Sequence, residues 1–201
     1  MCSTYDIGRR CILGNVAFNK FKDVWLQGKR ISLRKLIQVY EAMVTSVMLY
    51  NCSSWSAPQV ILEKLDVCQR KHLRSILNIR WPATITNIKL YDLCNITALS
   101  TRVKVARWRM FGHILRSPEN SPAALALSFA VVGSKSHKGL RGAHKMNLLK
   151  TIRKDLSITA TIKGSSYTTL TLKSQEDIDY LRDLAHDRRR RKELFYCRTM
   201  L

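Results

Sequence analysis

Acidic residues are scarce in the middle of this sequence. Between Asp66 and Asp155 the only acids are Asp92 and Glu119, whereas seventeen residues are Lys or Arg. The whole chain has 35 basic and 14 acidic residues and a formal net charge of +21. So few carboxylates cannot neutralise these cations through internal ion pairs, which predicts a surface that binds a polyanion. Nucleic acid is the leading candidate for that polyanion.

The sequence also lacks the usual catalytic signatures. It has no Asp-Asp pair, glycine-rich phosphate loop, HExxH or GxSxG motif, and its five histidines stand at no diagnostic spacing from an acid or a nucleophile. Two-metal polymerase chemistry needs neighbouring carboxylates. Asp177 and Asp179 lie in an expected helix, where they point about 200° apart. The chain is therefore predicted to be no enzyme on its own and to hold no cofactor.

Cysteine pairs and long apolar runs are missing as well. The six cysteines form no CxxC pair, and no secretory leader opens the sequence. We expect a reducing compartment, nuclear or cytoplasmic, with most thiols buried as small apolar groups. Cys68 and His72 have a helical i, i+4 spacing, but two ligands without a second pair do not predict a metal site. The longest uncharged apolar stretch, residues 123–132, is far shorter than the roughly 20 residues of a membrane span. Adhesion to anionic lipid remains a minor alternative.

The hydrophobic periodicity predicts a mostly α-helical fold, an irregular helical bundle. A helix over residues 6–26 is expected to be interrupted near Gly14. The next helix has Ser32 as its N-cap, and Ser56 with Gln59 fits a capping box for a third. That third helix is expected to stop at Trp81-Pro82.

The second half of the chain is expected to continue in the same way. Thr86 caps a short helix, Ser100 caps a longer one that ends before Pro118, and Ser174 starts the last one. Residues 133–153 have the composition of a basic loop or linker. Residues 159–173 are rich in Thr and fit either a small β-hairpin or a disordered insert.

A helical wheel of the helix expected after Ser100 separates its charges from its apolar residues. Arg102, Arg109, His113 and Arg116 fall on one narrow stripe, while Val103, Ala106, Met110 and Ile114 line an adjacent face. Trp108, Phe111 and Leu115 occupy a further sector. The apolar sides are expected to pack, and the basic stripe is expected to face phosphate.

Six segments of the sequence carry a family resemblance, at residues 17–25, 47–55, 68–81, 85–90, 100–116 and 185–191. In this order they resemble the region that follows the polymerase palm in reverse transcriptases of non-LTR (LINE-type) retrotransposons. At residues 138–142 the basic and glycine positions of a further family element are retained. There, however, Ala143 and His144 follow where the family has Pro, and Leu149 stands near its Trp.

The resemblance implies a thumb-like domain at residues 1–132, and a basic linker with a C-terminal helical segment at residues 133–201. It also implies that fingers and palm, with the catalytic aspartates, precede Met1 as the partner of this region. The implied role is to hold template RNA, RNA–DNA hybrid or DNA against an active site carried elsewhere. The alternatives are a decayed or truncated transposon-derived chain without independent activity, and a basic nucleic-acid-binding interaction module.

The residues expected to bind nucleic acid are cationic and lie in the acid-poor segment or in the final basic run. Such residues neutralise phosphates without reading sequence. The aromatic residues Trp81, Tyr91, Trp108 and Phe111 are interleaved with them, and aromatic residues at the edge of the surface can stack on unpaired bases. The candidate phosphate contacts are Arg70, Lys71, Arg74, Arg102, Lys104, Arg107, Arg109, His113, Arg116, Lys138, Arg141, Lys145, Arg188, Arg189, Arg190 and Arg191.

Overall fold

The computed structural model describes residues 3–22, 31–132, 148–163, 172–187 and 189. These residues are mostly helical and include no strand, which confirms the predicted fold class. The chain divides into two compact units. Unit 1 comprises Met1–Cys52 and Ala57–Val103, and unit 2 comprises Ser53–Ser56 and Lys104–Leu201. The division falls between Val103 and Lys104, inside a helix.

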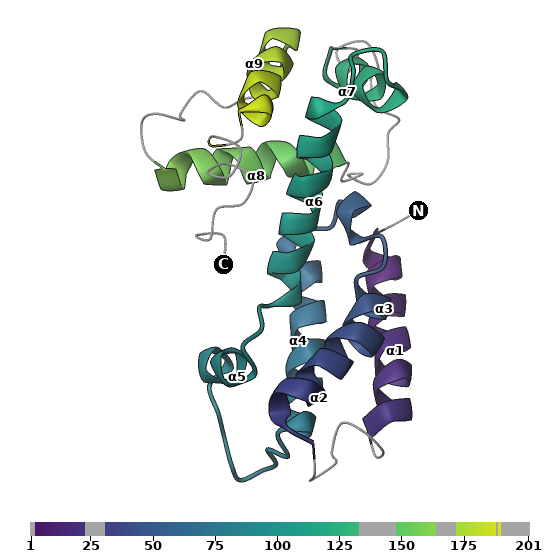
Figure 1. Cartoon of the computed structure of the whole chain (residues 1–201), viewed down its shortest axis with the longest axis vertical. Coiled ribbons are helices and arrows are strands. Elements are labelled where there is room, and N and C mark those ends of the chain that lie inside the picture. Colours follow the sequence, from purple (N-terminus) through teal and green to yellow (C-terminus); the bar gives the residue numbers. More distant parts are fainter. Residues whose placement is uncertain (1–2, 23–30, 133–147, 164–171, 188, 190–201) are drawn as a thin grey trace. The chain divides into compact units, whose positions relative to one another are not determined.

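Unit 1 is a group of helices built around α4, an 18-residue helix (Figure 1). The longest of the other helices, α1, packs against both α3 and α4. The core of this unit includes Ile7, Tyr40, Leu65 and Leu73, which are completely buried. In chain order the elements are α1 (Ser3–Phe21), α2 (Leu33–Tyr40), η2 (Glu41–Thr45), α3 (Ser46–Met48), η3 (Cys52–Ser54), α4 (Gln59–Ile76), α5 (Asn87–Cys94) and the first residues of α6 (Leu99–Arg116).

The predicted helix starts at Ser32 and Thr86 are confirmed, whereas the predicted start at Ser56 is wrong. Ser32 is the N-cap of α2, and Thr86 caps α5 by accepting a hydrogen bond from the Lys89 backbone N–H at 3.4 Å. The predicted capping box of Ser56 and Gln59 does not form. Instead α4 begins at Gln59 after an extended Pro58, whose carbonyl accepts the N–H of Leu62 at 3.2 Å.

The start of α6 is capped by side chains of α4. The predicted N-cap, Ser100, lies inside the first turn, and its backbone N–H and hydroxyl donate to the two carboxylate oxygens of Asp66 at 2.8 and 2.6 Å. The N–H of Leu99 donates to Gln69 Oε1 at 3.2 Å. A carboxylate is a stronger acceptor than a serine hydroxyl and also stabilises the positive end of the helix dipole. Asp66 therefore replaces the local cap that the sequence predicted.

Gly14 does not interrupt α1, contrary to the prediction. The helix is continuous through this residue, and Gly14 packs directly against Met48 of α3. A Cβ atom at Gly14 would lie 2.5 Å from Met48 Cγ and 2.9 Å from its Sδ. Met48 is itself completely buried, so it has little room to move away. The glycine is thus required by packing and not by a turn.

Unit 2 contains the remainder of α6 together with α7 (Pro122–Val132), α8 (Leu148–Lys163) and α9 (Gln175–His186). These helices share one apolar core, to which Trp108, Phe111 and Leu115 contribute from α6. Ser174 and Asp177 form the capping box of α9, which confirms the predicted helix start. Residues 159–163 belong to α8, so the predicted hairpin does not form there; residues 164–171 lie outside the described residues.

No helix within the described ranges combines the length and the apolar character that a membrane crossing requires.

We predict that Gly14→Ala destabilises the protein relative to Gly8→Ala by about 1–3 kcal/mol, because overpacking displaces Met48. Gly8 lies in the same helix, and a Cβ there meets nothing within 4 Å. The better helix propensity of alanine is gained at both positions, so the comparison isolates the steric term. Urea denaturation of the two variants measures the difference, and equal stabilisation by both would contradict the packing described.

Candidate nucleic-acid interface

The cations of α4 lie opposite its buried side. Arg70, Lys71 and Arg74 fall within about 100° of one another around the helix axis. None of the three is buried, and Lys71 is exposed. The buried side holds Leu62, Leu65, Asp66, Cys68, Gln69, His72, Leu73 and Ile76.

One of these cations is held in place by a residue of α5, and a second lies beside another residue of that helix. Arg74 Nη2 donates to Asn87 Oδ1 at 2.8 Å. Arg70 lies beside the hydroxyl of Tyr91; burial raises the pKa of this phenol, and the neighbouring guanidinium opposes that rise. Arg80 and Lys89, both exposed, follow in the next segment of the chain. We refer to Arg70, Lys71, Arg74, Arg80 and Lys89 as the α4 basic face.

In unit 2, α6 presents a second group of cationic side chains. Arg109, His113 and Arg116 lie within about 60° around the helix. Arg109 and His113 are exposed and Arg116 is half-buried. These three residues, the α6 basic stripe, stand apart from the buried Trp108, Phe111 and Leu115 on the same helix. Lys104 is half-buried and points about 140° away from Arg109.

Arg107 does not belong to either surface. Its side chain is completely buried in unit 2, where Nη1 donates to Asp155 Oδ2 at 2.8 Å and Nε donates to the carbonyl of Trp55 at 3.2 Å. A buried guanidinium that already has a carboxylate partner cannot reach a phosphate. The prediction that Arg107 contacts phosphate is therefore wrong. Arg107 has a structural role in the core of unit 2.

Arg102 is also engaged within its own unit. Its Nη1 forms an ion pair with Glu41 Oε2, and both side chains are only partly exposed. Its charge is thus offset, and we do not count it in the basic surfaces. Arg189 is exposed. Six of the predicted contacts lie outside the described residues: Lys138, Arg141, Lys145, Arg188, Arg190 and Arg191.

The four aromatic residues interleaved with the cations have different surroundings. Trp108 and Phe111 are core residues with 4% and 0% of their surface exposed, as expected for the apolar sides of their helix, so neither can stack on a base. Tyr91 is half-buried beside Arg70. Trp81, in contrast, is 90% exposed. Sequence spacing could not distinguish Tyr91 from Trp81, because both lie among cations.

His72 joins three helices of unit 1. Its Nε2–H donates to Asn15 Oδ1 at 2.9 Å, and the Tyr40 hydroxyl lies 3.2 Å from Nδ1. Its ring also stacks on Phe18, with 4.2 Å between the ring centroids. These partners suit a neutral imidazole with its hydrogen on Nε2, and burial lowers the pKa of His72 to about 4. The residue is a packed, hydrogen-bonded core histidine.

Several potential metal ligands and carboxylates of the described residues already have partners within the protein. The Cys68 thiol donates to Asn15 Oδ1 at 3.2 Å, the same atom that His72 uses. Asp177 accepts the backbone N–H groups of the α9 cap, and Asp179 contacts Arg182 at 3.7 Å. Within the described part of the chain, no three His, Cys, Asp or Glu residues gather as a metal site would require.

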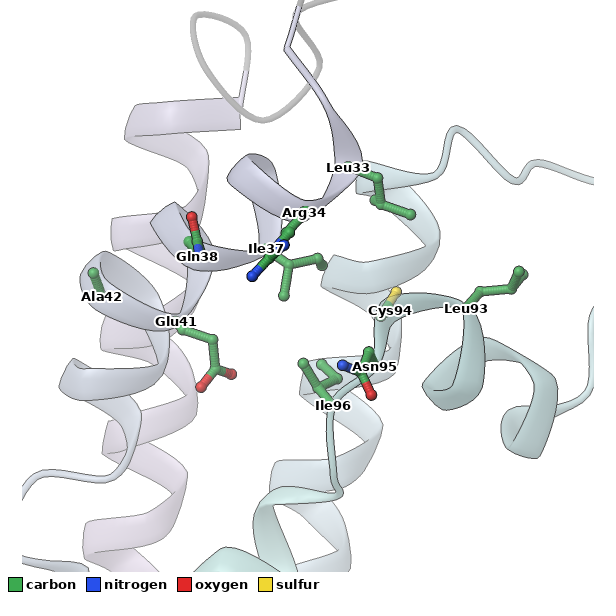
Figure 2. A pocket seen from close by; sticks show the side chains of 10 residues that line it. All are labelled: Leu33, Arg34, Ile37, Gln38, Glu41, Ala42, Leu93, Cys94, Asn95 and Ile96. Carbon is green, nitrogen blue, oxygen red and sulfur yellow. The ribbon is translucent and has the colours of Figure 1, made fainter.

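A groove of about 1070 Å³ lies in unit 1 between α2–η2 and the end of α5 (Figure 2). Its walls are largely apolar, with Leu33 and Ile37 on one side and Leu93 and Ile96 on the other. The carboxylate that lines it, Glu41, is the partner of Arg102. The groove therefore offers shape and apolar surface but no catalytic pair, and no motif or periodicity in the sequence pointed to it.

Comparisons with protein-family models, with curated proteins and with solved structures find no match for this chain.

We predict that His72 makes the protein sensitive to acid. The unfolded chain protonates this residue at an ordinary pKa of 6.5, whereas the folded chain does so only near a pKa of about 4. The unfolded state thus binds more protons between these values, so stability is full above pH 6.5 and falls as the pH drops towards 4. Between pH 7 and 4 the unmodified protein should lose roughly 3 kcal/mol more than His72→Gln. Urea titrations at several pH values test this, and parallel pH profiles would contradict it.

We predict that Arg107→Met destabilises unit 2 by about 3–5 kcal/mol, because it removes the guanidinium that pairs with the buried carboxylate of Asp155. The double variant Arg107→Met with Asp155→Leu should recover most of this loss, since no buried charge then remains. Chemical denaturation followed by circular dichroism provides the measurement. Equal stability of the single and the double variant would show that the pair does not act as described.

Proposed function

We propose that this chain is a non-catalytic nucleic-acid-binding region that holds RNA, RNA–DNA hybrid or DNA through its backbone phosphates. We further propose that it corresponds to the thumb-like and linker portion of a non-LTR retrotransposon reverse transcriptase. In that setting the active site belongs to a palm domain elsewhere. A nuclear or cytoplasmic location fits this role.

The α4 basic face is the observation that carries the proposal. Arg70, Lys71 and Arg74 lie on a helix whose opposite side is fixed by a buried core, so these three cations are presented on a rigid support. Between residues 67 and 98 the one acid is Asp92, and it is exposed. A dense positive surface with so little compensation favours a chain of phosphates over an isolated anion.

The α6 basic stripe supports the same function in unit 2. It combines two arginines, whose planar guanidinium groups match phosphate geometry, with an exposed histidine. The apolar cores of both units support a chain that folds, which argues against the alternative of a decayed remnant. The basic nucleic-acid-binding module remains as a broader form of the same proposal.

We predict that Lys71→Gln makes the fall of log K with log salt less steep, reducing the magnitude of the slope by about one, because one phosphate contact and its released counterion are lost. The loss of affinity should be the same for oligonucleotides of different sequence, since phosphates carry no sequence information. Fluorescence anisotropy with labelled RNA and RNA–DNA hybrid at several salt concentrations measures both quantities.

The matched control is Lys35→Gln, which removes the same charge from an exposed position on α2. It should leave the slope unchanged. A flat salt dependence for the unmodified chain would remove the proposal, and equal effects of the two variants would remove the role of the α4 basic face.

A further inference from the structure

Trp81 is the most exposed large apolar side chain among the described residues, at 90%. It stands in a tight turn, in which the N–H of Ala83 donates to the carbonyl of Arg80 at 2.9 Å. The segment that links α4 to α5 is closed at its base by the bond from Arg74 to Asn87, at 2.8 Å. Trp81 is therefore held at the tip of a pinned loop and contributes nothing to the core.

The surroundings of this tryptophan are cationic. Arg80 precedes it directly, Arg74 pins the loop at the end of α4, and Lys89 follows on α5. An indole with an open face beside an arginine, on a loop whose base carries further cations, suits an unpaired nucleotide, because the base stacks on the ring while the phosphates meet the charges. A base inside a duplex already has stacking neighbours on both of its faces.

We infer that Trp81 stacks on an unpaired base of a nucleic acid whose adjoining phosphates are held by Arg80 and the rest of the α4 basic face. This inference rests on the proposed function and adds a preference for single-stranded segments. Binding through phosphates alone would treat any strand of equal charge alike. The bases matter only if an aromatic surface such as Trp81 meets them.

The test compares the full chain with Trp81→Ala and Trp81→Phe on three probes: oligo(U), an abasic strand of the same length and charge, and a blunt RNA–DNA hybrid. Trp81→Ala should weaken oligo(U) binding by about 5- to 100-fold, as the loss of one base–aromatic stack does. Its affinity for the abasic strand and for the hybrid should change by less than about twofold, because their phosphates are still contacted. Trp81→Phe, which keeps an aromatic ring, should retain most of the oligo(U) affinity.

Tyr5→Ala is the matched control, because Tyr5 is an aromatic residue of the same unit with 74% of its surface exposed. It should leave all three affinities unchanged. Urea denaturation of each variant shows that the fold is kept, as expected for residues that make so few contacts with the core.

The failures of the two proposals give different results. If the unmodified chain has no salt-dependent affinity for any of the three probes, the proposed function fails and this inference fails with it. If the chain binds all three but Trp81→Ala matches the unmodified chain on oligo(U), only the stacking role of Trp81 is overturned. An equal loss on the abasic strand would overturn it as well. Binding to vesicles of phosphatidylserine and phosphatidylcholine is measured alongside the three probes. If Trp81→Ala loses affinity only for these vesicles, Trp81 belongs to a lipid-binding surface and the inference is also overturned.

Discussion

All of unit 1 depends on the buried side of α4, where Asp66, Gln69 and His72 each need a polar partner away from water. Asp66 and Gln69 find theirs at the start of α6, and His72 finds its partners on α1 and α2. Because a buried polar group without a partner is costly, these bonds fix the rotation of α4 about its axis. That rotation turns Lys71 and its cationic neighbours outward.

The distinction between structural and exposed cations changes how the charge of the chain is understood. Arg107 and Arg182 are both largely buried, and each reaches a backbone carbonyl as well as a carboxylate. They secure α6 within unit 2 and are not available to a polyanion. The formal charge of the sequence therefore overstates the charge presented at the surface, and the placement of each cation relative to the core decides its role.

Local features of the sequence predicted the helices well, whereas contacts between distant residues escaped prediction. Thr86 and Ser174 cap their helices because the required acceptors and donors lie within three residues. The Asp66 cap joins residues 34 positions apart and the Arg107 ion pair joins residues 48 positions apart, so neither can be detected from the local pattern of apolar residues. The stripe on α6 was visible on a helical wheel, but the burial of one cation and the exposure of Trp81 depend on which helices pack nearby.

The neutral state of His72 connects the stability of unit 1 to its basic surface. Acidification adds a proton to His72, whose Nδ1 would then face the Tyr40 oxygen as a second donor and whose charge would be buried. A loss of nucleic-acid affinity below pH 6 would thus arise from the weakened support of α4. A variant with a neutral residue at position 72 would distinguish this loss of stability from a direct effect of charge on binding.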